Sequence, residues 1–474
     1  MEYKDLEYWS QQAGQWTQEY YSKIGQQPVL SQVKPGEIKA KLHDSPPENP
    51  ESMETIFEDF KKIIPSGLTH WQHPRFFAYF NGNASPASIV AEQLANGIGA
   101  NGMLWQTSPS VTELEEQMVH WFRQALDLPN TFLGLIQDTA TIATFNAVLT
   151  MRERGLNWMG LTKGINQFPT LKVYASSENH SSIEKAVRLS GIGSDNLRVP
   201  DKLPNRSMDP NSLRSMILAD LQNGNIPVGV ILCCGGTAAG AFDQIEDTIK
   251  VAKEFDLYVH VDAAWAGSAM ICPEFRYLWK GIEGADSIVI NPHKWLGIQL
   301  DCSIQLLAKP EVQARTVGIQ PDYLKTDGIE NITNFSELTI ALGRRFRSLK
   351  IWFTLRAYGL KGLRQLIRDH VTWIKELEQK FVNDPEFEVS VSTPLALFGF
   401  RFIPEGFDSN QITNALCHAI NADGRVYLTH TTVDGSEIIR VTAGTYLTTR
   451  NDVLMVYDIV KEFGNRLKLT HPEH

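Results

Sequence analysis

Two residues able to do chemistry each follow an apolar run typical of a buried strand. Lys294 lies in NPHKWLG, directly after SIVIN, and Asp262 ends LYVHVD. A lysine at the end of such a strand can have a lowered pKa and form a Schiff base with a carbonyl compound. A carboxylate in an apolar run needs a cationic partner, either in a structural ion pair or as the protonated nitrogen of a pyridine ring. Taken singly, a solvated lysine and an ordinary ion pair remain open explanations.

Three more polar segments follow strand-like runs. In LIQDTATIATFNAVL, Asp138, Thr139 and Thr141 offer helix N-caps, although such caps are common. The first free backbone N–H groups of the following helix can bind a phosphate. His180 follows LKVYAS, where an imidazole could make a structural hydrogen bond or stack on a planar cofactor. Thr237 lies in GGTAAG, whose glycines do not match G-x-G-x-x-G, so we reject a dinucleotide site and expect a hydroxyl contact to a ring substituent.

The elements that position these residues alternate between strand and helix patterns. Nearly continuous apolar runs predict buried strands at 132–137, 171–176, 228–234, 257–263 and 287–291. Helical patterns occupy 142–154, 182–189 and 245–255. This alternation predicts an α/β fold with a mostly parallel central sheet and helices on both faces. Ligands bind outside the carboxyl ends of such strands, where the polar residues above gather.

The pattern divides the chain into three parts. Residues 1–85 form an N-terminal helical arm, with an aromatic-rich apolar stripe over 6–24 that its own body or a partner chain must cover. Residues 86–360 form the large α/β domain. Residues 361–474 form a smaller α+β domain, with a helix at 361–382, the strand-like runs FEVSVS, LFGFRFI and EIIRVTAG, and a last helix at 453–467.

The composition excludes several classes of protein. The 474 residues are 43% apolar and 21% charged, which is ordinary for a globular protein. With 44 basic and 54 acidic residues the formal charge is -10, so bulk attraction to nucleic acid or an anionic membrane is not expected. Five cysteines without C-x-x-C spacing predict neither a metal site nor a disulfide framework. With no signal-peptide or membrane-helix pattern, we expect a cytoplasmic protein.

Five dispersed segments together resemble the group II pyridoxal-phosphate decarboxylases, and most of all the aromatic-L-amino-acid decarboxylases. They are FFAYF, the stretch Asn179-His180-Ser181-Ser182, HVDAAWAGSAMICPEFR, NPHKWLG and LGRRFRSLKIWF. The resemblance covers nearly the whole chain. It implies the fold type I architecture of pyridoxal-phosphate enzymes, normally a homodimer whose N-terminal segments are intertwined.

The resemblance also implies roles for single residues. Lys294 would carry pyridoxal 5'-phosphate as a Schiff base, Asp262 would pair with the pyridinium nitrogen, and His180 would stack on the ring. Further cofactor contacts would come from Ala140, Thr141, Thr237, Ala264, Asn291 and His293. Tyr323, in GIQPDYLKTDGIEN, matches the tyrosine that serves decarboxylating members as general acid. The implied reaction removes CO₂ from an L-amino acid and yields the amine.

The implied substrate pocket contains both matches and departures. Its residues are Trp71, Tyr79, Phe80, Asn81, Gly82, Asn101, Met103 and Gly343. Gly343 matches the aromatic branch, because a missing side chain leaves room for a large ring. Asn81, Asn101 and Met103 replace the Pro, the aliphatic residue and the animal Phe of the family. The two amides could favour ring hydroxyls or a more polar substrate, so Dopa, tyrosine, tryptophan and 5-hydroxytryptophan are candidates, with the phenolic ones ahead.

Three alternatives compete with this hypothesis. An oxidative aldehyde synthase would carry Phe at position 323 or Asn at position 180, and this chain has Tyr323 and His180. A transaminase or lyase that keeps the carboxylate would need an arginine clamp, which the sequence leaves open. A cofactor-binding homologue without catalysis would bind pyridoxal phosphate and turn over no amino acid.

Overall fold

The computed structural model describes residues 1–319 and 332–470, whose contacts group into two compact units. Unit 1 comprises Met1–Asn81, His370–Val391 and Ala396–His474. Unit 2 comprises Gly82–Asp369 and Ser392–Leu395. The division into an arm, a large domain and a small domain stays a prediction.

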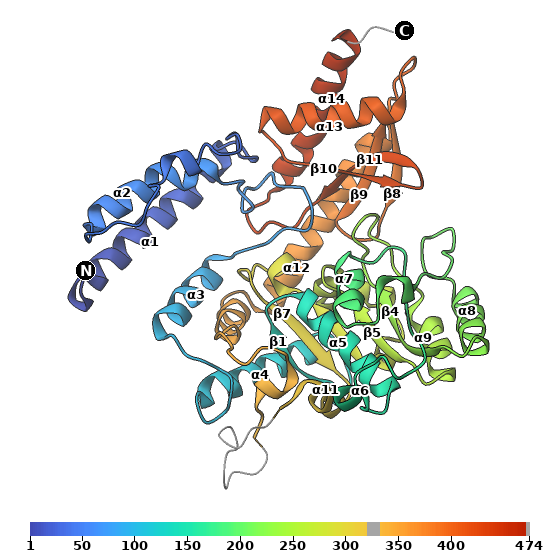
Figure 1. The fold of residues 1–474 in the computed structure, drawn as a ribbon. Coiled ribbons are helices and arrows are strands. Elements are labelled where there is room, and N and C mark those ends of the chain that lie inside the picture. The colour runs from blue at the N-terminus through green and yellow to red at the C-terminus, as the bar shows by residue number, and fades with distance from the viewer. Residues whose placement is uncertain (320–331, 471–474) are drawn as a thin grey trace. The chain divides into compact units, whose positions relative to one another are not determined.

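Unit 2 is built around a seven-stranded sheet in the order β1-β7-β6-β5-β4-β2-β3 (Figure 1). The strands are β1 (Leu133–Gln137), β2 (Leu171–Ala175), β3 (Leu197–Arg198), β4 (Ile226–Cys233), β5 (Tyr258–Asp262), β6 (Ser287–Ile290) and β7 (Ser303–Leu307). Neighbours from β3 to β6 are parallel, and β7 runs antiparallel to both β6 and β1. The prediction of a mostly parallel sheet is confirmed, and all five predicted strands are present.

Helices precede, connect and follow these strands. They are α3 (Pro86–Ile98), α4 (Pro109–Ala125), α5 (Ala140–Gly155), α6 (Gly160–Lys163), α7 (Ser182–Leu189), α8 (Pro210–Gln222), α9 (Ile245–Glu254), α10 (Pro292–Trp295) and α11 (Pro310–Val317). A core cluster joins Ala147 and Met151 of α5 and Val187 of α7 to Val173 of β2 and Ile231 of β4. This apolar packing seats α5 on the sheet with its N-terminus directly after β1.

Unit 1 contains two N-terminal helices and a four-stranded sheet in the order β10-β11-β9-β8 (Figure 1). The elements are α1 (Leu6–Lys23), α2 (Met53–Ile63), β8 (Phe387–Ser392), β9 (Leu397–Phe402), α13 (Ser409–Asp423), β10 (Thr429–Val433), β11 (Ser436–Thr442) and α14 (Arg450–Thr470). The helix α12 (Ser348–Val382) belongs to unit 2 up to Asp369 and to unit 1 from His370, and it is interrupted at Gly359, whose φ is 61°. Aromatic pairs of Phe381 with Phe387 and Phe400 build the core beneath the sheet.

Short 3₁₀ helices complete the described secondary structure. They span Tyr3–Asp5, Ile24–Gln26, Lys39–Lys41, Pro65–Gly67, Ser194–Asn196, Ala266–Ile271, Pro273–Trp279, Ile282–Gly284 and Phe335–Leu338. Within 1–319 and 332–470, no helix combines the length and the apolar character needed to cross a membrane. All five cysteines are buried free thiols.

Candidate active site

The first part of the site is the start of α5. Thr139 is its N-cap, and the Thr139 hydroxyl accepts a hydrogen bond from the Ile142 N–H at 3.4 Å. The N–H groups of the first helical residues have no intrahelical acceptor, so those of Ala140 and Thr141 can bind an anion beyond the end of β1. The turn is tied to β7, because the Ser303 hydroxyl lies 3.3 Å from the Asp138 carbonyl and 2.7 Å from Asn291 Oδ1.

His180 lies in the turn between β2 and α7. Its Nδ1 accepts the backbone N–H of Ser182 at 3.1 Å and lies 2.9 Å from the Ser182 hydroxyl. Burial lowers the pKa of His180, Asp262 opposes this shift, and Lys294 adds to it. The imidazole is therefore neutral at pH 7 and lies within the electrostatic reach of both residues.

Thr237 follows β4, and Asp262 ends the neighbouring strand β5. The Thr237 N–H donates to the Glu178 carbonyl at 3.3 Å, which joins the turn after β4 to the turn that carries His180. Asp262 is the last residue of β5 and is only 9% exposed, and its Oδ1 accepts the Ala264 N–H at 3.0 Å. The Ala264 carbonyl accepts the Asn291 N–H at 2.9 Å, so the ends of β5 and β6 are held together.

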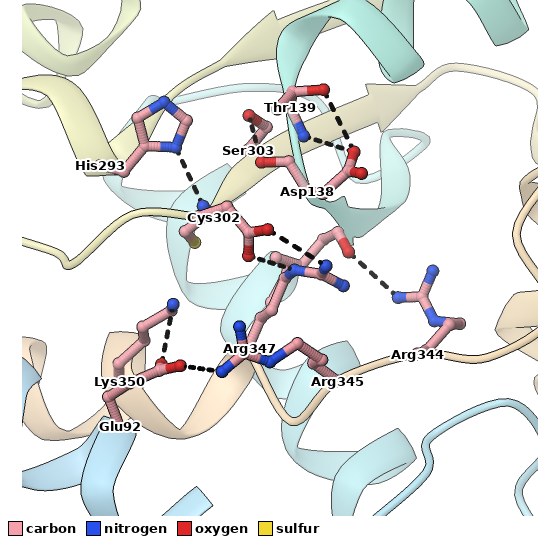
Figure 2. A network of polar contacts seen from close by, with 12 residues as sticks. Glu92, Asp138, Thr139, His293, Cys302, Ser303, Arg344, Arg345, Arg347 and Lys350 are labelled. Carbon is pink, nitrogen blue, oxygen red and sulfur yellow. Dashed lines mark hydrogen bonds and ion pairs between the residues drawn. The ribbon is translucent and has the colours of Figure 1, made fainter. Parts of the chain in front are cut away.

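Lys294 lies on the short helix α10 directly after β6. Trp295, which follows it, stacks on Trp265 with ring centroids 5.3 Å apart, and this fixes α10 against the turn after Asp262. His293 Nδ1 accepts the Cys302 N–H at 2.9 Å (Figure 2), and burial lowers its pKa to about 3. The neutral ring therefore carries its proton on Nε2, which is available to donate to an anion.

A network of ion pairs lies beside this helix (Figure 2). Glu92 of α3 binds Lys350 at 2.9 Å and also pairs with Arg345. Arg347 binds Asp301 at 2.8 Å. Burial is the main cause of the low pKa of His293. Within the network, Asp301 raises this pKa and Lys350 lowers it.

Four predicted substrate residues belong to unit 2. Gly82 precedes Asn83, whose N–H donates to the His293 carbonyl at 2.8 Å, so Gly82 lies beside the Lys294 helix. The exposed Asn101 accepts the Arg344 N–H at 2.9 Å, and its amide nitrogen lies 3.7 Å from the sulfur of Met103. A Cβ atom built on Gly343 would meet no atom within 4 Å. The Asn101–Arg344 contact places Asn101 beside the segment that carries Gly343, and the space next to Gly343 is open.

The segment that carries Gly343 is held by a buried ion pair. Arg344 and Glu115 of α4 pair with their side chains only 3% and 1% exposed. Glu115 also accepts the Ile136 N–H of β1 at 2.7 Å. This pair ties the segment to α4 and to the sheet.

The other four predicted substrate residues belong to unit 1. Trp71 stacks on Tyr79 with centroids 5.7 Å apart, and both rings are exposed. The Arg440 guanidinium lies 5.1 Å from the centre of the Phe80 ring. Asn81 is buried, and its amide nitrogen donates to the Phe76 carbonyl at 2.7 Å and the Thr445 hydroxyl at 2.8 Å. Asn81 therefore anchors its own loop.

Comparisons with known proteins identify the family of the chain. The family model described as "Pyridoxal-dependent decarboxylase conserved domain" matches residues 35–403. The chain belongs to this decarboxylase family. A tyrosine decarboxylase of Papaver somniferum is 37% identical over 471 residues, covering 94% of this chain and 91% of the relative. A phenylacetaldehyde synthase of a Rosa hybrid cultivar is 36% identical over 473 residues, covering 96% and 92%. A crystal structure of Oryza sativa TDC with PLP and tryptamine superposes with a TM-score of 0.95 at 31% identity, covering 98% and 99%.

Membership confirms the fold type I prediction and makes the chain a pyridoxal-phosphate-dependent amino-acid decarboxylase. The donor set of the decarboxylase site fits this cofactor. A phosphate needs N–H donors, which the start of α5 and His293 supply, a pyridine nitrogen needs the carboxylate of Asp262, and an aldehyde needs the amine of Lys294. In the part of the chain that the structure describes, no group of three or more His, Cys, Asp or Glu side chains is arranged to hold a metal ion.

The sequence analysis missed several residues of the site region. The Arg344–Glu115 and Lys350–Glu92 pairs were not predicted, because their members lie far apart in the chain. Glu92, Glu115 and Lys350 did offer a signal, because each is a charge within a helical segment, whereas Arg344 lies in the loop before α12. Tyr323, the predicted general acid, lies outside the described residues.

Proposed function

We propose that this decarboxylase acts on an aromatic L-amino acid, with tyrosine or Dopa ahead of tryptophan and 5-hydroxytryptophan, and releases the amine and CO₂. The observation that carries the proposal is the position of His180, Asp262 and Lys294 at the carboxyl ends of β2, β5 and β6, which are parallel strands of one sheet with β4 between β2 and β5. The charges of Asp262 and Lys294 both act on the pKa of His180. It is supported by relatives named as tyrosine decarboxylase and by the rice structure with tryptamine.

When bound, pyridoxal phosphate supplies an electron sink for the electron pair left at Cα as CO₂ departs. Lys294 would hold the cofactor aldehyde through its amine and yield that place to the substrate amine. Asp262 would keep a proton on the pyridine nitrogen, and His180 would lie against the ring face. Ala140, Thr141, Asn291 and His293 would bind the phosphate, and Thr237 and Ala264 would contact the ring and its substituents.

The end of the reaction needs a proton at Cα, which we assign to Tyr323. A relative named as a phenylacetaldehyde synthase makes the aldehyde outcome the second candidate. The presence of both Tyr323 and His180 favours the amine.

The preference for phenolic substrates is supported by the arrangement around Asn101. Its carbonyl oxygen is taken by the Arg344 N–H, so the amide N–H₂ group is the part left to bind a ligand. Among the described residues, that group has a weak sulfur contact at 3.7 Å, so it can donate to a ring hydroxyl. The open space at Gly343 leaves room for the ring.

We also propose a cytoplasmic homodimer. No residue of α1 is buried, although Trp9 and Trp16 pack on Phe57 and Phe60 of α2 at 5.7 and 4.8 Å. A partner chain would cover the rest of this aromatic face. Mass photometry of the purified protein tests the dimer.

The substrate proposal is tested by incubating the cofactor-loaded enzyme with the standard amino acids, Dopa and 5-hydroxytryptophan, and identifying products by mass spectrometry. Tyramine and dopamine as the main products are expected. Loss of CO₂ from a polar amino acid alone would overturn the aromatic assignment and leave the decarboxylase assignment in place.

A further inference from the structure

Eight polar side chains lie buried beneath the strand ends of the site, each at most 3% exposed. We call them the polar row: Gln137, Thr144, Asn146, His260, Ser287, Gln305, Gln313 and Thr339. None of them is among the residues assigned to the cofactor or the substrate.

The strand members lie one step deeper than the site on the same face of the sheet. His260 and Asp262 are two residues apart on β5, and Gln305 and Ser303 are two residues apart on β7, so each pair points to one face. His260 pairs directly with Ser287 of β6. The strand residues of the polar row therefore lie directly beneath the site residues, on the same face of the sheet.

Hydrogen bonds connect the row from strand to strand. His260 Nδ1 lies 3.0 Å from the Ser287 hydroxyl, which accepts from Gln305 Nε2 at 3.3 Å. The side-chain amides of Gln305 and Gln313 form two reciprocal hydrogen bonds of 2.9 and 3.2 Å. Gln137 Nε2 donates to Gln305 Oε1 at 3.1 Å. The row thus crosses four neighbouring strands, β5, β6, β7 and β1, and reaches α11.

The same row holds the first turns of α5. The Thr144 hydroxyl lies 3.2 Å from His260 Nε2, and the Ala143 carbonyl accepts from Gln305 Nε2 at 3.2 Å. Asn146 Nδ2 donates to the Thr339 hydroxyl at 3.3 Å. The first of these contacts is at Ala143, three residues after Ala140. Ala140 carries one of the free N–H groups at the start of the helix.

Such a row is not explained by stability alone. Apolar side chains of the same volume would pack there with little loss of folding stability. The free energy gained from a typical buried hydrogen bond only modestly exceeds the cost of removing its groups from water. Directional bonds do fix the rotation and the axial position of a helix, which apolar contacts leave loose. Burial lowers the pKa of His260 to about 4, so the ring is neutral at pH 7, with one nitrogen that donates and one that accepts.

We propose that the polar row positions the start of α5 over the strand ends and so sets the affinity for the cofactor phosphate, with His260 as the central positioning residue. The proposal rests on the proposed placement of that phosphate at Ala140 and Thr141. Because the row acts on the end of the cofactor that carries the phosphate, disrupting the row weakens the binding of a phosphorylated ligand. The binding of the unphosphorylated ligand is unaffected.

Two threonines of α5 give a matched test. Thr144 and Thr150 are both fully buried, but within the described part of the chain the Thr150 hydroxyl donates to the Asn146 carbonyl of its own helix, at 2.7 Å, and to no group of the sheet. Apoenzyme prepared from the wild-type holoenzyme, and from the T144V and T150V variants, is titrated with pyridoxal phosphate and with pyridoxal, which lacks the phosphate. The change in cofactor absorbance gives each Kd.

We expect T144V to raise the Kd for pyridoxal phosphate about fivefold, the effect of one lost hydrogen bond, with the Kd for pyridoxal unchanged. T150V should change neither constant. An equal loss for both ligands in T144V, or equal effects of T144V and T150V, would overturn the proposal and leave the row a structural feature. If the wild-type chain binds both ligands equally well, the phosphate placement itself is wrong.

A second variant tests the central position of His260. S287A removes the hydroxyl on the other side of the ring, and the double variant T144V/S287A removes both partners. If His260 transmits the constraint, the double variant raises the Kd for pyridoxal phosphate by less than the product of the two single effects. Independent, multiplicative effects would remove His260 from the centre of the row.

Discussion

The backbone N–H of Ser182 donates to Nδ1 of His180 at 3.1 Å, which leaves the proton of the neutral imidazole on Nε2. Burial holds the pKa of His180 below 6.5. As the pH falls through 6.5, the unfolded chain therefore binds a proton at this position before the folded chain does, so this group makes the folded state less stable at lower pH.

We therefore expect the His180 ring to be the Nε2-H tautomer and to titrate below pH 6.5. The check is ¹⁵N NMR of histidine-labelled protein across pH, with His180→Asn to assign the signal. A proton on Nδ1, or a titration midpoint at or above 6.5, would contradict this assignment.

Asp262 is expected to act through its charge. Asp262→Asn keeps the shape of the side chain and a carbonyl oxygen for the Ala264 N–H, which lies 3.0 Å from Asp262 Oδ1. It loses the negative charge that we propose as the partner of the pyridine nitrogen. We expect kcat to fall about a hundredfold while the cofactor still binds. The control is Asp220→Asn. Asp220 is a buried carboxylate on α8 that accepts a hydrogen bond from the Tyr174 hydroxyl of β2 at 2.9 Å, and its substitution should leave kcat unchanged. Equal kcat values for the two variants would remove Asp262 from the reaction.

Tyr323 is expected to decide the product. If its hydroxyl supplies the proton at Cα, as we propose, Tyr323→Phe should divert product from the amine to the aldehyde. Chromatography of the products under air measures the ratio. An unchanged yield of amine would show that another group donates the proton.

The Arg344–Glu115 pair is expected to contribute strongly to stability. Glu115→Gln leaves the guanidinium buried without its counter-charge, which should lower the free energy of unfolding by about 3 kcal/mol. Glu462→Gln, whose carboxylate pairs with Arg425 and Arg466 at the surface, should change it by less than about 0.5 kcal/mol. Urea unfolding of the two variants makes the comparison, and similar losses in both would refute the special role of the buried pair.

The strands of the site were predictable because their sequences are locally distinctive. LYVHVD and SIVIN are short, apolar and β-branched, and both form strands that end at Asp262 and just before Asn291. Parallel strands bring their carboxyl ends to one edge, so the grouping of Asp262 with Lys294 followed from the pattern. The helix at 182–189 was predicted with the observed bounds because its apolar residues repeat at helical spacing.

Other features depend on contacts that no local pattern encodes. β7 was missed because its polar Ser303 and Gln305 interrupt the apolar run, and both point to the face that carries the polar row. Arg344 and Glu115 are 229 residues apart and meet only in the folded chain. The groupings of Asn101 with Arg344 and of Asn81 with Thr445 likewise arise from loop packing.

The most direct test of the central claim is the balance of products from L-tyrosine labelled in its carboxyl carbon. The holoenzyme is expected to release one labelled CO₂ per tyramine, without consuming oxygen or releasing ammonia. Lys294→Ala should abolish steady turnover, and borohydride reduction of the wild-type holoenzyme should leave the pyridoxyl group on Lys294. Label retained in the product, or turnover by Lys294→Ala close to that of the wild type, would contradict the account.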